Sequence, residues 1–245
     1  MASRWIRTVS PMTDPTEDVQ NFLTIHGLRF PDDPNVLRGR VRGLLRKGQY
    51  ELKEFEAVQA LANADDVVLE LGGGIGFLST VAARLGGVKS VHSYEANPAL
   101  IPYIHAVHQA NGVTNAHVTN AVLSAAQPGT TNFYVRRNLL ASSLDPMQGK
   151  NDGGVVAVEQ VPVENIAIAV KTIRPSVLVC DIEGAEADIL PHADLSGLRC
   201  AIVELHPQWI GQSGVQAVFD AMSAAGLTYF PNRSNRKVVT FRKGW

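Results

Sequence analysis

The sequence is poor in cysteine, in long apolar runs and in net charge. Its 245 residues include two cysteines, Cys180 and Cys200, and each lies in an apolar segment, so we expect buried free thiols and no disulfide framework. No run of about 18 apolar residues occurs, which argues against a membrane span. The N-terminal residues also lack the apolar core of a secretion signal. These absences predict a cytoplasmic protein.

Charge is balanced overall but uneven along the chain. The formal net charge is −1, so nothing global indicates nucleic acid or a membrane as a partner. Residues 38–47, RGRVRGLLRK, carry five basic residues and no acidic one. Such a run is usually a solvated surface. The alternative is a basic rim that attracts an anionic substrate.

Two regions of the chain differ in pattern. Residues 1–49 are rich in proline and aspartate and lack a steady period, so they are predicted to form an N-terminal arm or cap with one short helix over residues 18–28. Residues 50–245 are predicted to form the main domain. This domain opens with a helix over residues 50–63, and strands alternate with helices from residue 65 onward.

This alternation predicts the fold class. Five strands of the βα type are expected over residues 66–71, 90–96, 116–123, 176–182 and 199–205. Two extra strands, at 130–137 and 156–163, interrupt the alternation, and two short strands, at 228–232 and 237–241, close the chain. Strands separated by helices run parallel, whereas a closely joined pair must be antiparallel. We therefore expect an α/β, Rossmann-like, seven-stranded sheet, mostly parallel, with a C-terminal antiparallel hairpin and helices on both faces.

The glycine-rich turn after the first of these strands indicates an adenine-containing cofactor. A triphosphate-binding loop would need a lysine after the glycines, and none follows. A dinucleotide site would need G-x-G-x-x-G, but Phe77 or Ser79 occupies the last position in the two possible registers. The stretch instead fits acidic-x-G-x-G-x-G. It supplies the predicted cofactor contacts Glu70, Gly72, Gly73, Gly74 and Gly76.

This pattern favours S-adenosylmethionine. A carboxylate at Glu70 suits the positive ammonium and sulfonium groups of that cofactor, whereas it would repel a pyrophosphate. Glu95, which ends the second strand, is placed to accept hydrogen bonds from both ribose hydroxyls, and Ala96 follows it. Glu95 alone discriminates poorly, because dinucleotide folds carry a similar acid. The prediction of S-adenosylmethionine over a dinucleotide rests on the glycine spacing, Glu70 and the antiparallel hairpin together.

Four segments, LELGGGIGFLS, YEANP, NAVLS and VCDIEGAEADIL, resemble the FkbM-type family of class I, S-adenosylmethionine-dependent methyltransferases. The resemblance covers roughly residues 50–241, and its most specific part is the D-I-E-G-A-E block at residues 181–186. It implies O-methylation of a hydroxyl on a small molecule, a sugar or a secondary metabolite. It also implies that Asn120 and Ala121 border the adenine ring.

Candidate catalytic residues stand at the predicted carboxyl ends of strands. Methyl transfer to a hydroxyl needs alignment of the acceptor and removal of its proton. Asp181, Glu183 and His206 are predicted to serve there, with Asp181 also near the cofactor and His206 as general base. The alternatives are helix capping by Asp181, dipole-favoured placement of Glu183 and a structural His206. These residues could with Glu204 hold a divalent metal, but no metal site is predicted.

Two flanking segments are predicted to cover the site. Tyr50 and Glu51 open the main domain, just before its core, where related folds carry a lid over the cofactor. The loop with Asn138, Ser142 and Ser143 is the predicted substrate-side wall, although a polar loop without function is equally compatible.

Two other function classes stay open at this point. An RNA or protein methyltransferase is one, although a nearly neutral chain lacks the wide basic patch of an RNA enzyme. A non-catalytic protein that binds an adenosyl ligand is the other. We predict a small hydroxylated acceptor, with an anionic acceptor as an option because of residues 38–47, and no nucleic-acid or membrane partner.

Overall fold

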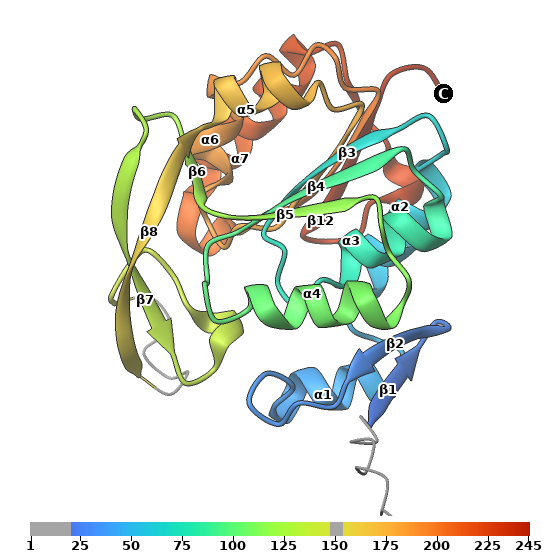
Figure 1. The fold of residues 1–245 in the computed structure, drawn as a ribbon. Helices are drawn as coiled ribbons and strands as arrows, with labels where there is room; N and C mark the ends of the chain where they lie inside the picture. The colour runs from blue at the N-terminus through green and yellow to red at the C-terminus, as the bar shows by residue number, and fades with distance from the viewer. Residues whose placement is uncertain (1–20, 148–153) are drawn as a thin grey trace, which may run out of the picture.

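The computed structural model describes residues 21–147 and 154–245, and it is built around a seven-stranded sheet (Figure 1). In spatial order the strands are β11 (Thr228–Tyr229), β12 (Val238–Arg242), β10 (Cys200–Glu204), β9 (Val177–Cys180), β3 (Val67–Leu71), β4 (Ser90–Glu95) and β5 (Ala116–Asn120). The five strands from β10 to β5 are parallel, while β12 is antiparallel to both β10 and β11. The predicted fold class is confirmed.

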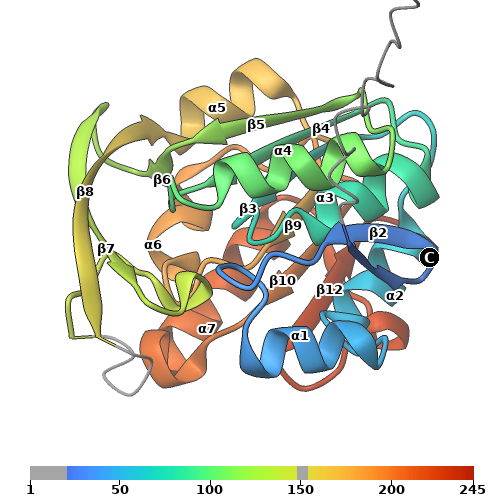
Figure 2. The same cartoon turned by 60° about the horizontal axis from the view of Figure 1, so that its bottom comes forward.

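Helices cover both faces of this sheet, as the predicted class requires (Figures 1 and 2). On one face lie α2 (Leu52–Leu61), α3 (Phe77–Val81), its π-helical continuation η1 (Ala82–Gly86) and α4 (Ile101–Ala110). On the other lie α5 (Ile166–Ile173), α6 (Glu186–Ile189), the 3-10 turn η3 (Leu190–His192) and α7 (Pro207–Ala224). Among the described residues, no helix combines the length and apolarity needed to cross a membrane.

Side-chain alternation explains why the central strands are apolar on both sides. In β3, Val68 packs against the cluster formed with α2 to α4, whereas Leu69 and Leu71 pack against the cluster formed with α5 to α7. The same alternation continues through β9 and β10. Strands buried on both faces bury nearly every side chain, which is typical of parallel sheets.

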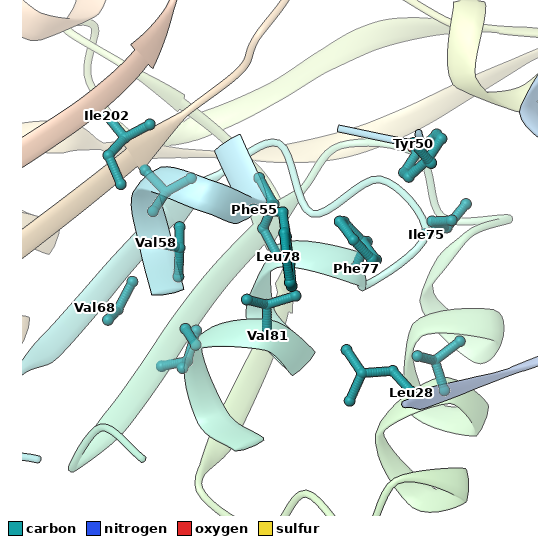
Figure 3. Close-up of a cluster of buried hydrophobic side chains, with 14 of the residues drawn as sticks. Leu28, Tyr50, Phe55, Val58, Val68, Ile75, Phe77, Leu78, Val81 and Ile202 are labelled. Atoms are coloured by element: carbon teal, nitrogen blue, oxygen red, sulfur yellow. The ribbon is translucent and has the colours of Figure 1, made fainter. Parts of the chain in front are cut away.

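The first core cluster is centred on aromatic side chains (Figure 3). Phe77, which is fully buried, lies 5.5 Å from the ring of Tyr50, 5.7 Å from Phe30 and 6.1 Å from Phe55. Burying one such side chain contributes about 1.5–3 kcal/mol. These contacts join α2 and α3 to residues that precede the main domain.

The N-terminal segment folds differently from the prediction. Instead of a short helix over residues 18–28, the structure has a hairpin of β1 (Phe22–Ile25) and β2 (Leu28–Pro31), followed by α1 (Gly39–Arg46). The helix prediction is wrong where the residues are described, and residues 18–20 lie outside them. His26 and Gly27, both at positive φ, make the tight turn.

This hairpin is part of the same hydrophobic core as the rest of the chain. Phe30 is fully buried against Phe77, and the hydroxyl of Tyr103 donates to the carbonyl of Pro31 at 2.8 Å. The described part of the arm (1–49) therefore shares a core with the domain at residues 50–245. The boundary between an arm and a methyltransferase domain remains a prediction.

A second, three-stranded sheet stands beside the main one. It consists of β6 (Val122–Ser124), β8 (Val155–Asn165) and β7 (Gly129–Arg136) in that order. The two extra strands predicted from the sequence are thus present. The single strand expected over 116–123 is wrong, because the chain leaves the main sheet at Ala121. The amide of Asn120 donates to the carbonyls of Glu95 and Ala96, which ends the pairing of β5.

Helix α5 is absent from the elements predicted from the sequence. Its apolar, β-branched residues follow directly on β8 and read as a continued strand. Two local features nevertheless indicate a helix. Ile166, Ala169, Val170 and Ile173 pack at helical spacing, and the side chain of Asn165 caps the N-terminus by accepting the N–H of Ile168 at 3.2 Å.

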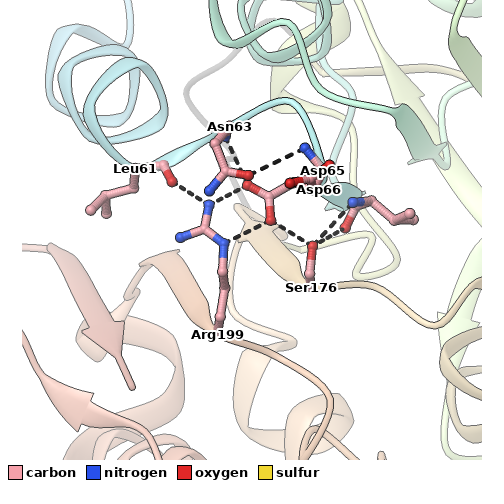
Figure 4. A network of polar contacts seen from close by, with 7 residues as sticks. Leu61, Asn63, Asp65, Asp66, Ser176 and Arg199 are labelled. Carbon is pink, nitrogen blue, oxygen red and sulfur yellow. Dashed lines mark hydrogen bonds and ion pairs between the residues drawn. The ribbon is translucent and has the colours of Figure 1, made fainter. Parts of the chain in front are cut away.

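A buried ion pair ties strands together at the end of the sheet away from their carboxyl termini (Figure 4). Asp66, which is 2 % exposed, accepts from the guanidinium of Arg199 and from the hydroxyl of Ser176. Arg199 also donates to the carbonyl of Leu61. The network joins the starts of β3, β9 and β10.

Candidate active site

A cavity of about 940 Å³ opens at the carboxyl ends of β3, β4, β9 and β10. The strand order reverses between β3 and β9, which is where open α/β sheets bind their ligands. The predicted site residues that line the cavity are Gly72, Gly74, Glu95, Ala96, Ala121, Asp181 and Glu183, together with the lid residues Tyr50 and Glu51. The predicted site residues that do not line it are Glu70, Gly73, Gly76, Asn120 and His206.

The glycine loop between β3 and α3 forms one wall of the cavity. At Gly72, φ is +87°, and an added Cβ atom would lie 1.9 Å from the carbonyl oxygen of Asp181. At Gly74, φ is +53° and the position opens toward the cavity. Side chains are therefore excluded where the loop faces the cavity, and a ligand can approach the main chain there. Gly73 and Gly76 lie behind this surface, against Ser93 and Ile104 respectively.

Glu95 stands at the end of β4 with both carboxylate oxygens held by the main chain. Oε2 accepts the N–H of Gly74 at 2.8 Å, and Oε1 accepts the N–H of Asn97 at 2.6 Å. Burial raises the pKa of Glu95 to about 7. Each oxygen keeps a second lone pair, so the carboxylate can still accept hydrogen bonds from a diol at the cavity wall.

Glu70 does not line the cavity. It shares the α2–α4 face of β3 with Val68, is 2 % exposed and accepts a hydrogen bond from the hydroxyl of Ser93. Burial raises its pKa to about 8. The structure thus places Glu70 beneath the glycine loop, beside β4. A direct cofactor contact by Glu70 remains a prediction.

The predicted adenine-side residues lie where β5 leaves the main sheet. Ala121 is buried and lines the cavity. Asn120 is not among the lining residues; its amide instead fixes the carbonyls of Glu95 and Ala96. Asn120 therefore shapes the end of β4 from the neighbouring strand.

Carboxyl groups crowd one end of the cavity. They come from Asp181 and Glu183 after β9, Glu204 at the end of β10, and Glu51 and Glu54 at the start of α2. Burial raises the pKa of Glu51 to about 8 and that of Glu54 to about 7. Burial, together with the charges of Glu204 and Glu183, raises the pKa of Asp181 well above its usual range. Such raised values suit proton transfer near neutral pH.

His206 lies directly behind these carboxyl groups. It is 3 % exposed and is not a lining residue, but its Nε2 atom lies 3.3 Å from Glu183, 3.7 Å from Asp181 and 3.9 Å from Glu204. Burial lowers the pKa of His206, yet the hydrogen bond to Glu186 and the neighbouring carboxylate charges outweigh it, so the pKa is raised. Of the three carboxyl groups, that of Glu183 lies nearest to Nε2.

The same residues resemble a metal-binding group in composition. Among the described residues, ligand atoms of Asp181, Glu204 and His206 all lie within 4.8 Å of one another. Imidazole and carboxylate donors of this kind can hold a divalent cation. Without a cation, a protonated His206 would itself balance part of the negative charge of these carboxylates.

The covering segments come from two separate parts of the chain, the start of α2 and the loop after β7. Tyr50 and Glu51 line the cavity, and Glu51 adopts a left-handed backbone with φ of +43°. Ser142 and Ser143 line it from the loop after β7, whereas Asn138 does not. Four of the five residues predicted to cover the site therefore lie at the cavity, and their roles as lid and substrate-side wall remain predictions.

Further lining residues were missed by the sequence reasoning. These include Arg40 of α1, Leu140, Asp188 and the half-exposed Trp209 of α7. Trp209 follows His206 by three residues, and the one-turn spacing after a strand end was an available signal. Arg40 belongs to the basic run at residues 38–47, and it is the one basic residue of that run that lines the cavity.

Solved structures share this architecture at low sequence identity. Trm5b from Pyrococcus abyssi matches with a TM-score of 0.50 and 12 % identity over 94 % of this chain, which spans 57 % of that protein. Precorrin-6y C5,15-methyltransferase from Geobacter metallireducens matches with a TM-score of 0.50 and 11 % identity, covering 87 % of this chain and 97 % of that one. M. jannaschii TYW2, solved in complex with AdoMet, has a TM-score of 0.49 and 10 % identity, covering 95 % and 90 %.

Residues 62–229 match the family model described as the methyltransferase FkbM domain. This match, on a Rossmann-like fold, defines a class I, S-adenosylmethionine-dependent methyltransferase. The chain belongs to the FkbM methyltransferase family, and S-adenosylmethionine is its cofactor. A search of curated proteins gave no match.

Proposed function

We propose that the protein O-methylates a hydroxyl group of a small molecule, a sugar or a secondary metabolite. The observation that carries this proposal is the cavity, in which a glycine loop and Glu95 stand opposite a cluster of carboxyl groups with raised pKa values. One side suits the cofactor, and the other suits removal of a hydroxyl proton.

Residues on the β3 and β4 side fit the cofactor. The main chain at Gly72 and Gly74 is open to a ligand, and the Glu95 carboxylate lies at its edge. Ala96 and Ala121 provide apolar surface for an adenine ring. When bound, S-adenosylmethionine supplies a methyl group on a positively charged sulfur, and the surrounding carboxyl groups stabilise such a charge.

On the opposite side, the chain's own residues handle the proton. Asp181 lines the cavity, so it can accept the hydroxyl proton directly. His206 stands behind it, held by Glu186, with Nε2 3.7 Å from Asp181 and 3.3 Å from Glu183, so the proton would pass to His206 through Glu183. Glu183 completes the group around Nε2. Loss of the hydroxyl proton leaves the oxygen nucleophilic enough to attack a methyl group.

The charges of the lining residues favour a small acceptor that is not anionic near Asp181. Eight of these residues are acidic, and the cations among them within the described chain are Arg40 and Lys53. Lys53 pairs with Glu56 at 2.7 Å. An anionic group of the acceptor would therefore have to face Arg40 at the rim. RNA, with its continuous phosphates, is disfavoured by the same reasoning.

Calorimetric titration of the purified protein with S-adenosylmethionine, S-adenosylhomocysteine and NAD tests the cofactor side. We expect micromolar binding of the adenosyl compounds, no binding of NAD, and an affinity loss of roughly tenfold or more in Glu95→Ala, as for a hydrogen bond to a charged group. Glu56→Gln, outside the cavity, should bind normally. Binding of NAD alone would overturn the proposal.

Transfer from tritiated S-adenosylmethionine tests the acceptor side. A panel of monosaccharides, glycosides and phenolic alcohols, with tRNA and a protein extract as separate samples, should give label in a hydroxylated small molecule. Label in tRNA or protein would instead establish the alternative function. Tight cofactor binding with no transfer to any sample would favour a non-catalytic binding protein.

A cytoplasmic location is proposed on the sequence alone.

A further inference from the structure

Glu186 is the most deeply buried charged residue near the site, and the proton pathway above does not use it directly. It is the first residue of α6 and has no exposed surface. Its Oε1 atom lies 2.7 Å from Nδ1 of His206 and accepts the N–H of Gly184 at 3.0 Å. Its second oxygen, Oε2, is buried without a hydrogen-bond partner.

We propose that Glu186 is a positioning residue for methyl transfer: its carboxylate holds the His206 imidazole as the Nδ1–H tautomer, with Nε2 turned toward Asp181, Glu183 and Glu204. The inference rests on the proposed function, because it assigns a role in the proton pathway of that reaction. It adds a residue that does not touch the cavity.

The position of the proton follows from the donors around Oε1. An ionised carboxylate only accepts hydrogen bonds, and Oε1 already accepts one from the main chain at Gly184. With Glu186 as a carboxylate, the proposal places the hydrogen of the 2.7 Å contact on Nδ1. In the neutral ring the lone pair is then on Nε2, which is the atom nearest the cavity-lining carboxyl groups.

The backbone of His206 is fixed as well. Its carbonyl accepts the N–H groups of Trp209 and Ile210 at 2.8 and 3.0 Å, because it starts helix α7. Only side-chain rotation could turn the ring away, and Glu186 opposes that rotation. A carboxylate that orients an imidazole through one nitrogen leaves the other nitrogen free for proton transfer.

The charged groups around the ring come from three places. Glu186 lies on α6, Asp181 and Glu183 lie on the segment between β9 and α6, and Glu204 ends β10. All are carboxyl groups, so all favour the protonated ring. Glu186 is the one among them that contacts Nδ1, and its removal should change both the tautomer and the proton affinity.

The test is nuclear magnetic resonance of the full-length protein, labelled with ¹⁵N-histidine, over a range of pH. The His206 signal is the one that is absent from the spectrum of His206→Asn. We expect the Nδ1–H tautomer in the neutral wild-type ring. In Glu186→Gln the pKa of His206 should fall by about one unit or more. The pH profile of kcat, measured with the acceptor that gives most tritium transfer, should shift by the same amount.

Controls separate this role from a structural one. Asp66→Asn removes a buried carboxylate at the opposite end of the sheet, so it should leave the His206 signal unchanged. Glu186→Asp retains the charge and should restore part of the pKa. An Nε2–H tautomer in the wild type overturns the proposal without any variant. An unchanged His206 pKa in a folded Glu186→Gln, or a pH profile that does not follow it, also overturns it.

Failure of the proposed function gives a different result. If S-adenosylhomocysteine binds but no label from tritiated S-adenosylmethionine enters a hydroxylated small molecule, the proposed function fails, whatever the tautomer of His206. If such a molecule is labelled and the tautomer is Nε2–H, the proposed function stands and the role of Glu186 fails.

Discussion

Gly72 and Asp181 touch through their main chains. A Cβ atom at Gly72 would lie 1.9 Å from the carbonyl oxygen of Asp181, and the N–H of Asp181 donates to the carbonyl of Leu71 at 2.9 Å. The contact joins the glycine loop after β3 to the segment that carries the catalytic candidates after β9. A direct main-chain contact therefore fixes the distance between the glycine loop and Asp181.

Gly72→Ala should abolish cofactor binding. The added methyl group would push two main-chain segments apart, and neither can yield as a flexible side chain would. We expect the affinity for S-adenosylhomocysteine to fall by about 100-fold or more in calorimetry, or the protein to lose its fold. Gly43→Ala, in the open space of α1, should keep normal affinity. Normal affinity in Gly72→Ala would contradict the observed contact.

The folded protein should lose stability as the pH rises. Burial raises the pKa of Glu51 to about 8 and those of Glu54 and Glu95 to about 7. Because the folded state holds these protons more tightly than the unfolded state, the stability is full below the ordinary pKa of 4.5 and is lost as the pH rises to about 8. We expect Tm to fall between about pH 4.5 and 8.

Glu51→Gln tests the source of this slope. A tenfold difference in proton affinity corresponds to about 1.4 kcal/mol, and about 1 kcal/mol changes Tm by roughly 2–4 °C in a protein of this size. The variant should therefore show a flatter dependence of Tm on pH. Glu56→Gln, which loses only the pair with Lys53, should keep the wild-type slope. A Tm that rises with pH would contradict the prediction.

Arg199→Met should destabilise the fold without changing the site. It leaves the buried Asp66 carboxylate without its ion pair, and such losses cost about 3–5 kcal/mol. Urea unfolding should show this loss, while S-adenosylhomocysteine affinity stays normal in the folded variant. Arg199 and its hydrogen-bonding neighbours hold the pKa of Asp66 below its usual range against burial. Their stabilisation is present above the ordinary pKa and is lost as the pH falls.

Asp181→Asn should lower kcat far more than cofactor affinity. The amide keeps the size of the side chain but cannot accept a proton, and loss of a general base typically costs about 10²–10⁴-fold. Transfer from tritiated S-adenosylmethionine measures the effect. Asp220→Asn, on the exposed part of α7 and bonded to Gln216, serves as the matched control. Equal kcat in the two variants would remove Asp181 from the proton pathway.

The parts of the site that are local in sequence were predictable. Glu95 ends β4 and Asp181 directly follows the apolar strand β9, and parallel strands bring their carboxyl ends to one edge. The orientation of Glu70 was predictable in principle as well. The period of two in β3 puts Glu70 on the face of Val68, away from Leu71 at the cavity.

Contacts that depend on packing between distant elements were not predictable. Glu186 and His206 are 20 residues apart, and their contact requires α6 to lie against the start of α7. The departure of β6 from the main sheet depends on pairing with β8, some 40 residues later. Helix α5 was not predicted because its β-branched residues have a strand-like composition, which outweighed the local signals of helical spacing and the Asn165 cap.

Because the chain leaves the main sheet at Ala121, one wall of the cavity is built by an insertion with a sheet of its own. Residues from β6 to β8 leave the main sheet, form their own three-stranded sheet and return at α5 (Figure 1). The loop after β7 supplies Leu140, Ser142 and Ser143 to the cavity, while the glycine loop and Glu95 belong to the main sheet. The insertion thus contributes to the cavity from a sheet of its own, and exchanging it between relatives would test whether the acceptor can change on an unchanged methyl-donor site.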